Sequence, residues 1–174
     1  MIDTTVPIAI HVGFLTVFSE GAGFLGGYLV TNSWGRPLEF RLSTAVQPNR
    51  VQQILYGNTL TEYVCVDLIG KTLVEKAATP IHLLVTDSAD VLPIRSQIEV
   101  PIIAAIPDND LIASLTHPRS SVPLVLPPEH ANDEETVRAL LDRLDAALDL
   151  AEPFTRIREA MTEARKMGVT SRAA

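Results

Sequence analysis

Three carboxylates stand at positions where strands or helices are expected to begin or end. Glu20 follows an apolar run over residues 8–18, Glu62 lies in the first turn of an expected helix, and Asp87 follows a second apolar run. Carboxylate oxygens are ligands that Mg²⁺ and Mn²⁺ prefer, and two such ions can stabilise the attacking and leaving oxygens of a phosphodiester displacement. If the three acids converge, they predict a site for Mg²⁺ or Mn²⁺. If they do not, we expect no cofactor.

The same acids have a structural explanation, which the sequence leaves open. An acid in the first turn of a helix interacts favourably with the helix dipole, which accounts for Glu62. Acidic and other polar residues are common where the chain turns after a strand, which accounts for Glu20 and Asp87. Under this interpretation, none of the three acids has a catalytic role.

A glycine-rich segment supplies a third interpretation. Residues Gly21 to Gly26 read GAGFLG, which matches the G-x-G-x-x-G pattern of dinucleotide-binding loops, and Glu39 lies about where an acid would bind the ribose. That pattern needs a helix after the loop, yet residues 27–35 read GYLVTNSWG and contain many poor helix formers. We therefore expect a connection between strands here and keep a nucleotide site as an alternative.

The first half of the chain is expected to be rich in strands. Residues 8–18 are β-branched and aromatic, and residues 38–42 alternate between apolar and polar types. The turn-forming residues Asn32–Gly35 predict that Tyr28–Leu42 is a β-hairpin. Together with the first strand, this hairpin would make a three-stranded antiparallel unit.

The rest of the chain alternates between expected helices and buried strands. The predicted segments are a helical turn at 48–57, a helix at 59–78, strands at 81–85 and 100–106, a loop or short helix at 107–128, and helices at 132–150 and from 154 to Gly168. The two C-terminal helices should bury Val137, Leu141, Leu144 and Phe154 against the sheet or against a second copy. The predicted fold is α/β (or α+β): one domain over 1–168 with a mixed sheet and packed helices, and a flexible tail over 169–174.

This order of elements resembles the ribonuclease H-like fold. The local sequences TEY around Glu62 and TDS around Asp87, and the segment EHANDEE at 129–135, are similar to that family's acidic positions. The resemblance implies that the acids at the end of the first strand, in the first helix and at the end of the fourth strand bind two magnesium ions. Here they would be Glu20, Glu62 and Asp87. Because Glu20 stands where the family has Asp, the resemblance also suits a degenerate site.

Composition narrows the choice of partners. The net charge is −7, and the arginine and lysine groupings are too sparse for a nucleic-acid surface, so we expect them to be solvated and expect no nucleic-acid partner. These groupings are Arg36, Arg41 and Arg50, and Arg156, Arg158, Arg165 and Lys166. The chain has one cysteine, Cys65, and no apolar run long enough for a membrane span, so we expect a cytoplasmic protein.

Several catalytic classes lack their motifs in this sequence. It contains no H-E-x-x-H, C-x-x-C, G-x-S-x-G or P-loop pattern, which argues against zinc proteases, α/β-hydrolases and Walker NTPases. The leading prediction is a non-catalytic interaction or regulatory module, either a degenerate ribonuclease H-like domain or a longin- or roadblock-like platform. Its partner would be another protein or a second copy, bound through the C-terminal helices. The alternatives are a metal-dependent phosphodiester hydrolase using Glu20, Glu62 and Asp87, and a nucleotide binder at Gly21–Gly26.

Overall fold

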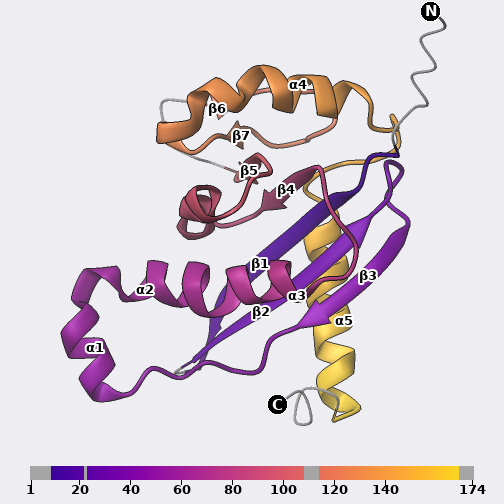
Figure 1. Cartoon of the computed structure of the whole chain (residues 1–174). Helices are drawn as coiled ribbons and strands as arrows, with labels where there is room; N and C mark the ends of the chain where they lie inside the picture. Colours follow the sequence, from indigo (N-terminus) through magenta and orange to yellow (C-terminus); the bar gives the residue numbers. More distant parts are fainter. Residues whose placement is uncertain (1–8, 22, 108–113, 169–174) are drawn as a thin grey trace, which may run out of the picture.

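Three antiparallel strands open the fold. The computed structural model describes residues 9–21, 23–107 and 114–168, and the predicted tail at 169–174 lies outside them. β1 (Val12–Glu20) pairs with β2 (Gly23–Thr31), and β2 pairs with β3 (Pro37–Leu42). The predicted three-stranded antiparallel unit is therefore confirmed (Figure 1).

The turn of the predicted hairpin is also confirmed. The N–H of Gly35 donates to the carbonyl of Asn32 over 3.2 Å, and the Asn32 side-chain oxygen accepts from the N–H groups of Trp34 and Arg36. Gly35 has a φ of 90°, a conformation that glycine adopts without strain. Asn32 and Gly35 are thus the two residues that fix this turn.

The remaining strands extend the sheet on the other side of β1. β4 (Leu83–Thr86) is parallel to β1, and β5 (Ile102–Ala105) is parallel to β4. The strand order is β3-β2-β1-β4-β5-β7-β6, in which β6 (Ser114–Leu115) and β7 (Leu124–Val125) are antiparallel to their neighbours. The sheet is mixed, as expected from the sequence.

The segment at 107–128 corrects one expectation. It was expected to be a loop or a short helix, but it contains β6 and β7. These strands have two residues each, and an alternating pattern of apolar and polar residues cannot be recognised over so short a segment. Residues 108–113, which include most of the expected short helix, lie outside the described part of the chain.

One face of the sheet is covered by the helical segment expected at 59–78. It consists of α2 (Leu60–Glu62), the π-helical η2 (Tyr63–Gly70) and α3 (Lys71–Lys76), and it is preceded by α1 (Arg50–Tyr56) and η1 (Gly57–Thr59). The 3₁₀-helical η3 (Ala89–Gln97) connects β4 to β5 and joins the same apolar cluster. The expected helix is confirmed, with a π-helical centre that its apolar pattern does not predict.

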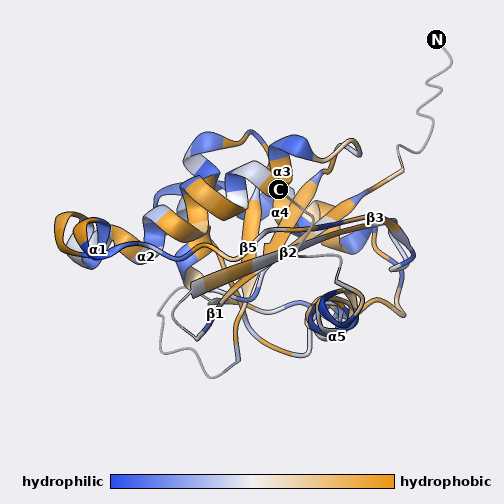
Figure 2. Ribbon diagram, turned by 90° about the horizontal axis from the view of Figure 1, so that it is seen from below, coloured by the Kyte–Doolittle hydropathy of each residue, from blue (hydrophilic) through white to orange (hydrophobic). Residues whose placement is uncertain are grey.

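The C-terminal helices cover the opposite face. They are α4 (Glu134–Asp142), which follows η4 (Pro128–Asp133), and α5 (Pro153–Lys166). Figure 2 shows α5 on one side of the sheet, with α2 and α3 on the other. Val137, Leu141, Leu144 and Phe154 are all buried, as predicted, and they lie against the chain's own sheet.

The helix expected at 132–150 is shorter than predicted. α4 ends at Asp142, and the chain then forms turns. Asp145 explains the ending, because its N–H donates to the carbonyl of Ser33 and its side chain accepts from the N–H of Ala147. Both bonds replace helical ones and hold the chain beside the β2–β3 turn.

Two adjacent glycines let helices approach β2 from both sides. A Cβ atom at Gly27 would lie 2.5 Å from Cγ2 of Ile157 on α5, and one at Gly26 would overlap Ile69 on η2. Both positions therefore need a residue without a side chain.

Among the described residues, no helix is long and apolar enough to cross a membrane.

Candidate functional site

The register of β1 and β4 determines which residue lies beside Asp87. The parallel pairing ends with Leu15 opposite Thr86, so Asp87 follows β4 at the level of Thr16. Phe14 and Val85 on these strands belong to the core layer under α5. Because side chains alternate along a strand, Thr16 and Asp87 point to that same face.

Arg158 of α5 contacts three groups at this point. Its Nη2 donates to Oδ2 of Asp87 over 2.5 Å and to Oγ1 of Thr16 over 3.3 Å. Its guanidinium carbon lies 5.6 Å from the centre of the Phe18 ring, within range of a cation–π interaction. We call Thr16, Phe18, Asp87 and Arg158 the Asp87 site.

Asp87 is mostly enclosed, whereas Arg158 is half exposed. The exposed fractions of their side chains are 15% and 48%. Oδ1 of Asp87 is buried and has no hydrogen-bond partner among the residues that the structure describes. A buried carboxylate needs a counter-charge, and in this site the guanidinium of Arg158 supplies it.

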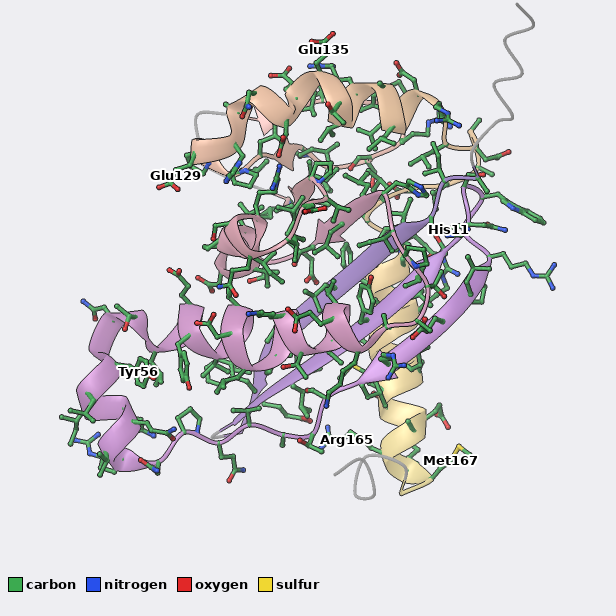
Figure 3. The ribbon with its side chains drawn as sticks, in the orientation of Figure 1. His11, Tyr56, Glu129, Glu135, Arg165 and Met167 are labelled. Carbon is green, nitrogen blue, oxygen red and sulfur yellow. The ribbon has the colours of Figure 1, made fainter. Side chains whose placement is uncertain are left out.

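Glu20 forms a second ion pair with α5. It lies four residues beyond Thr16 on β1, a distance of about 13 Å along the strand, and its carboxylate accepts from Nη1 of Arg165. Figure 3 labels Arg165 near the C-terminal end of α5. Arg158 and Arg165 are seven residues apart, which places them on one face of the helix. Two carboxylates of the sheet thus hold α5 at two points.

Glu62 is in the other helical layer. It is in α2, and it lines a cavity of about 490 Å³ between α2, η3 and η4. Five apolar or proline residues line this groove, with Glu62, Glu129 and His130 among its polar residues. The apolar lining consists of Ala89, Leu92, Pro93, Pro127 and Pro128. Glu62 therefore faces different neighbours from Glu20 and Asp87.

The described residues do not assemble the expected metal ligands. Within 9–21, 23–107 and 114–168, no group of three or more His, Cys, Asp or Glu residues could hold a metal ion. Arg158 and Arg165 bind the carboxylates of Asp87 and Glu20, which makes these two acids poor ligands for a cation. The donor set in this part of the chain does not fit the two-ion site that the ribonuclease H-like resemblance implies.

The glycine-rich segment is a strand connection. Gly21 lies in the turn with a φ of 62°, and β2 begins at Gly23, where a dinucleotide loop would lead into a helix. The N–H of Gly26 donates to Oγ of Ser43 over 2.8 Å, so it does not point toward a phosphate. The expected connection is confirmed, and the nucleotide interpretation loses the geometry that it needs.

Glu39, the candidate ribose-binding acid, has a structural role. Its carboxylate accepts from the N–H groups of Ala78 and Thr79 and from Nε of Arg41. Burial disfavours its ionisation, but Arg41 and the two N–H groups outweigh burial and lower the pKa of Glu39 to about 2. Glu39 thus fixes the chain after α3 to β3.

Cys65 is a buried core residue. It lies in η2, and burial raises the pKa of its thiol to about 11. A thiol that is protonated at neutral pH is a poor nucleophile. Cys65 therefore contributes to packing, as its apolar neighbours in the sequence indicate.

The sequence analysis did not predict that arginines of the C-terminal helix contact the acids. We expected Arg158 and Arg165 to be solvated, yet each contacts a carboxylate on the sheet. Their spacing of seven residues was an available signal, because it places both charges on one face of an amphipathic helix. The partner of Asp87 on β1 is Thr16, which only the strand register reveals.

Comparisons with known proteins give no family for this chain. No family model matches it, and no curated protein is significantly similar to it. Among solved structures, endonuclease V of Ciona intestinalis in complex with an inosine-containing DNA matches with 12% identity and a TM-score of 0.42, over 79% of this chain and 59% of that one. A variant of that enzyme, also bound to DNA, matches with 11% identity and a TM-score of 0.34, over 79% and 58%. The chain thus spans less than two thirds of these proteins, and similarity at this level assigns neither a fold family nor an activity.

Proposed function

We propose that this chain is a non-catalytic interaction or regulatory domain, cytoplasmic and of ribonuclease H-like topology, whose acidic positions now anchor its C-terminal helix. The observation that carries the proposal is the contact of Arg158 with Asp87 and Thr16. In the family that the sequence resembles, the acid at the end of the fourth strand would bind a metal ion. Here a guanidinium of the same chain neutralises that acid.

The topology supports the ribonuclease H-like part of the proposal. The chain has three antiparallel strands followed by a helical segment, and then two parallel strands beside β1. This is the strand arrangement that the resemblance implies. The free, buried thiol of Cys65 suits the reducing compartment that we propose.

A protein partner stays part of the proposal. The apolar residues of α4 and α5 lie in the chain's own core. A contact through these helices would therefore use their charged outer faces, including residues such as Glu134 and Glu163. An exposed apolar surface on α1 offers a second place for a partner.

A phosphodiester hydrolase is the second candidate, and one observation favours it. Within the described part of the chain, Oδ1 of Asp87 is buried and accepts no hydrogen bond, so one oxygen of the carboxylate is still available to a cation. An assay of the full chain with short DNA, RNA and hybrid duplexes in Mg²⁺ or Mn²⁺ separates the candidates. We expect wild type and Asp87→Asn to be equally inactive. Metal-dependent cleavage by wild type that Asp87→Asn abolishes would establish the hydrolase.

A further inference from the structure

α1 has an apolar stripe that faces solvent. Val51, Ile54 and Leu55 are exposed by 63%, 63% and 77%, and no residue of the helix is buried. Positions i, i+3 and i+4 lie on one side of a helix, so the three side chains form a continuous ridge. Arg50 is one turn from Ile54 and places a positive charge at the edge of this ridge.

The position of α1 is nevertheless well fixed. Asn49 and Gln52 form a reciprocal capping box at its start, and the ring of Tyr56 stacks on that of Tyr63 with centroids 4.2 Å apart. A helix of seven residues is marginal in water unless other contacts stabilise it. Figure 2 shows α1 projecting from the side of the molecule, with part of its ribbon in the hydrophobic colour. The fold thus holds an apolar ridge in place without covering it.

The groove beside α2 has the complementary chemistry. Of its five apolar lining residues, Ala89, Pro93 and Pro128 are exposed, whereas Leu92 and Pro127 are buried. Its volume of about 490 Å³ lies within the usual range for binding sites. Glu62 and Glu129 are exposed at this groove, and neither forms an ion pair within the described residues. Arg95 is already paired with Asp133 over 2.7 Å. The groove therefore presents an apolar surface with two available negative charges.

We propose that α1 of one copy of this chain binds in the groove of a second copy, and that the second copy returns the same contact. Val51, Ile54 and Leu55 would contact the apolar lining, and Arg50 would lie near Glu62 and Glu129. This inference extends the proposed interaction function by naming a partner.

The positions of the two surfaces suit a closed dimer. α1 joins α2 through η1, and the groove begins at Glu62 in α2. In Figure 3, Tyr56 at the end of α1 and Glu129 at the groove are labelled on the same side of the molecule. A ridge and a groove on one side allow two copies to exchange contacts about a two-fold axis, which ends the assembly at two copies. The reciprocal contact also doubles the buried area.

Sedimentation of the full chain over a range of concentrations tests this proposal. We expect the wild-type mass to rise from one copy to two, and Ile54→Asp to weaken the association at least tenfold. The groove variant, which combines Glu62→Lys and Glu129→Lys, should weaken the association by a similar factor. Adding Arg50→Glu to the groove variant should restore part of the affinity. Met167→Asp is the matched control, because Met167 is 76% exposed and lies outside both surfaces.

Three results would overturn the proposal. The first is a wild type that stays monomeric at every concentration. The second is a dimer that Ile54→Asp does not weaken. The third is a dimer that Ile54→Asp weakens but the groove variant does not, since this would indicate that α1 packs against another surface. None of these results bears on Asp87 and Arg158, which lie in neither surface, so the two proposals can fail separately.

Discussion

The contact between Arg158 and Asp87 should contribute measurably to the stability of the fold. Hydrogen bonds to charged groups contribute about 1.5–3 kcal/mol. Because 48% of the Arg158 side chain is exposed, solvent screening reduces this figure, and we expect a coupling of about 1–2 kcal/mol. Arg158→Met keeps most of the aliphatic stem but removes the contacts with Thr16 and Phe18 as well as the ion pair, so the ion pair is isolated by combining this variant with Asp87→Asn.

The assay is a double-mutant cycle by urea unfolding. It uses wild type, Arg158→Met, Asp87→Asn and the double variant, so that the interaction free energy follows from the four unfolding free energies. Arg138 and Glu134 on α4 are the control pair, with exposed fractions of 46% and 50%, and should couple by about 0.3–0.5 kcal/mol.

The change in stability caused by Asp87→Asn distinguishes a cluster of three acids from an ion pair with Arg158. If three acids converged without metal, the loss of one charge would relieve repulsion, and Asp87→Asn would be as stable as wild type or more stable. If Asp87 is paired with Arg158, the same substitution should destabilise the fold. Additive single effects, or a stabilised Asp87→Asn variant, would refute the ion pair as an anchor of α5.

Three further predictions concern the framework around the site. Gly27→Ala should destabilise the fold by about 1–3 kcal/mol in urea unfolding, because its Cβ would lie 2.5 Å from Ile157. An unchanged free energy of unfolding would show that α5 does not pack closely on β2. Leu141→Ala, at a fully buried position, should cost about 2–5 kcal/mol by the same measurement, and a smaller cost would place α4 outside the core. The pKa of Glu39 is lowered from 4.5 to about 2, so its contribution to the free energy of unfolding is complete above pH 4.5 and is lost as the pH falls toward 2. Glu39→Gln should therefore reduce the loss of stability at acid pH, as measured by urea unfolding at several pH values. A variant with the same pH dependence as wild type would contradict this.

The sequence predicts much of the fold because its strongest patterns are local. The alternation at 38–42 and the turn residues Asn32 and Gly35 specify the first hairpin, and the structure agrees. β6 and β7 were not predicted because a strand of two residues is too short to show the alternation of apolar and polar side chains. The end of α4 was missed because it depends on a contact between Asp145 and Ser33, which are far apart in the sequence.

The candidate site is less predictable because it depends on register and on a distant helix. Sequence order places Glu20 at the end of β1, but the pairing with β4 places Thr16, four residues earlier, beside Asp87. Arg158, in the helix α5, is 71 residues from Asp87 in the chain. Local patterns identify the acids, and only the packing of α5 identifies what they bind.

Titration of Mn²⁺ into the metal-free full chain tests the central claim most directly. We follow binding by calorimetry and stability by the melting temperature in wild type, Asp87→Asn and Arg158→Met. If Arg158 satisfies Asp87, wild type should neither bind Mn²⁺ at this site nor melt at a higher temperature in its presence, and Asp87→Asn should respond identically. Stoichiometric binding that raises the melting temperature of wild type, and that Asp87→Asn abolishes, would contradict the account.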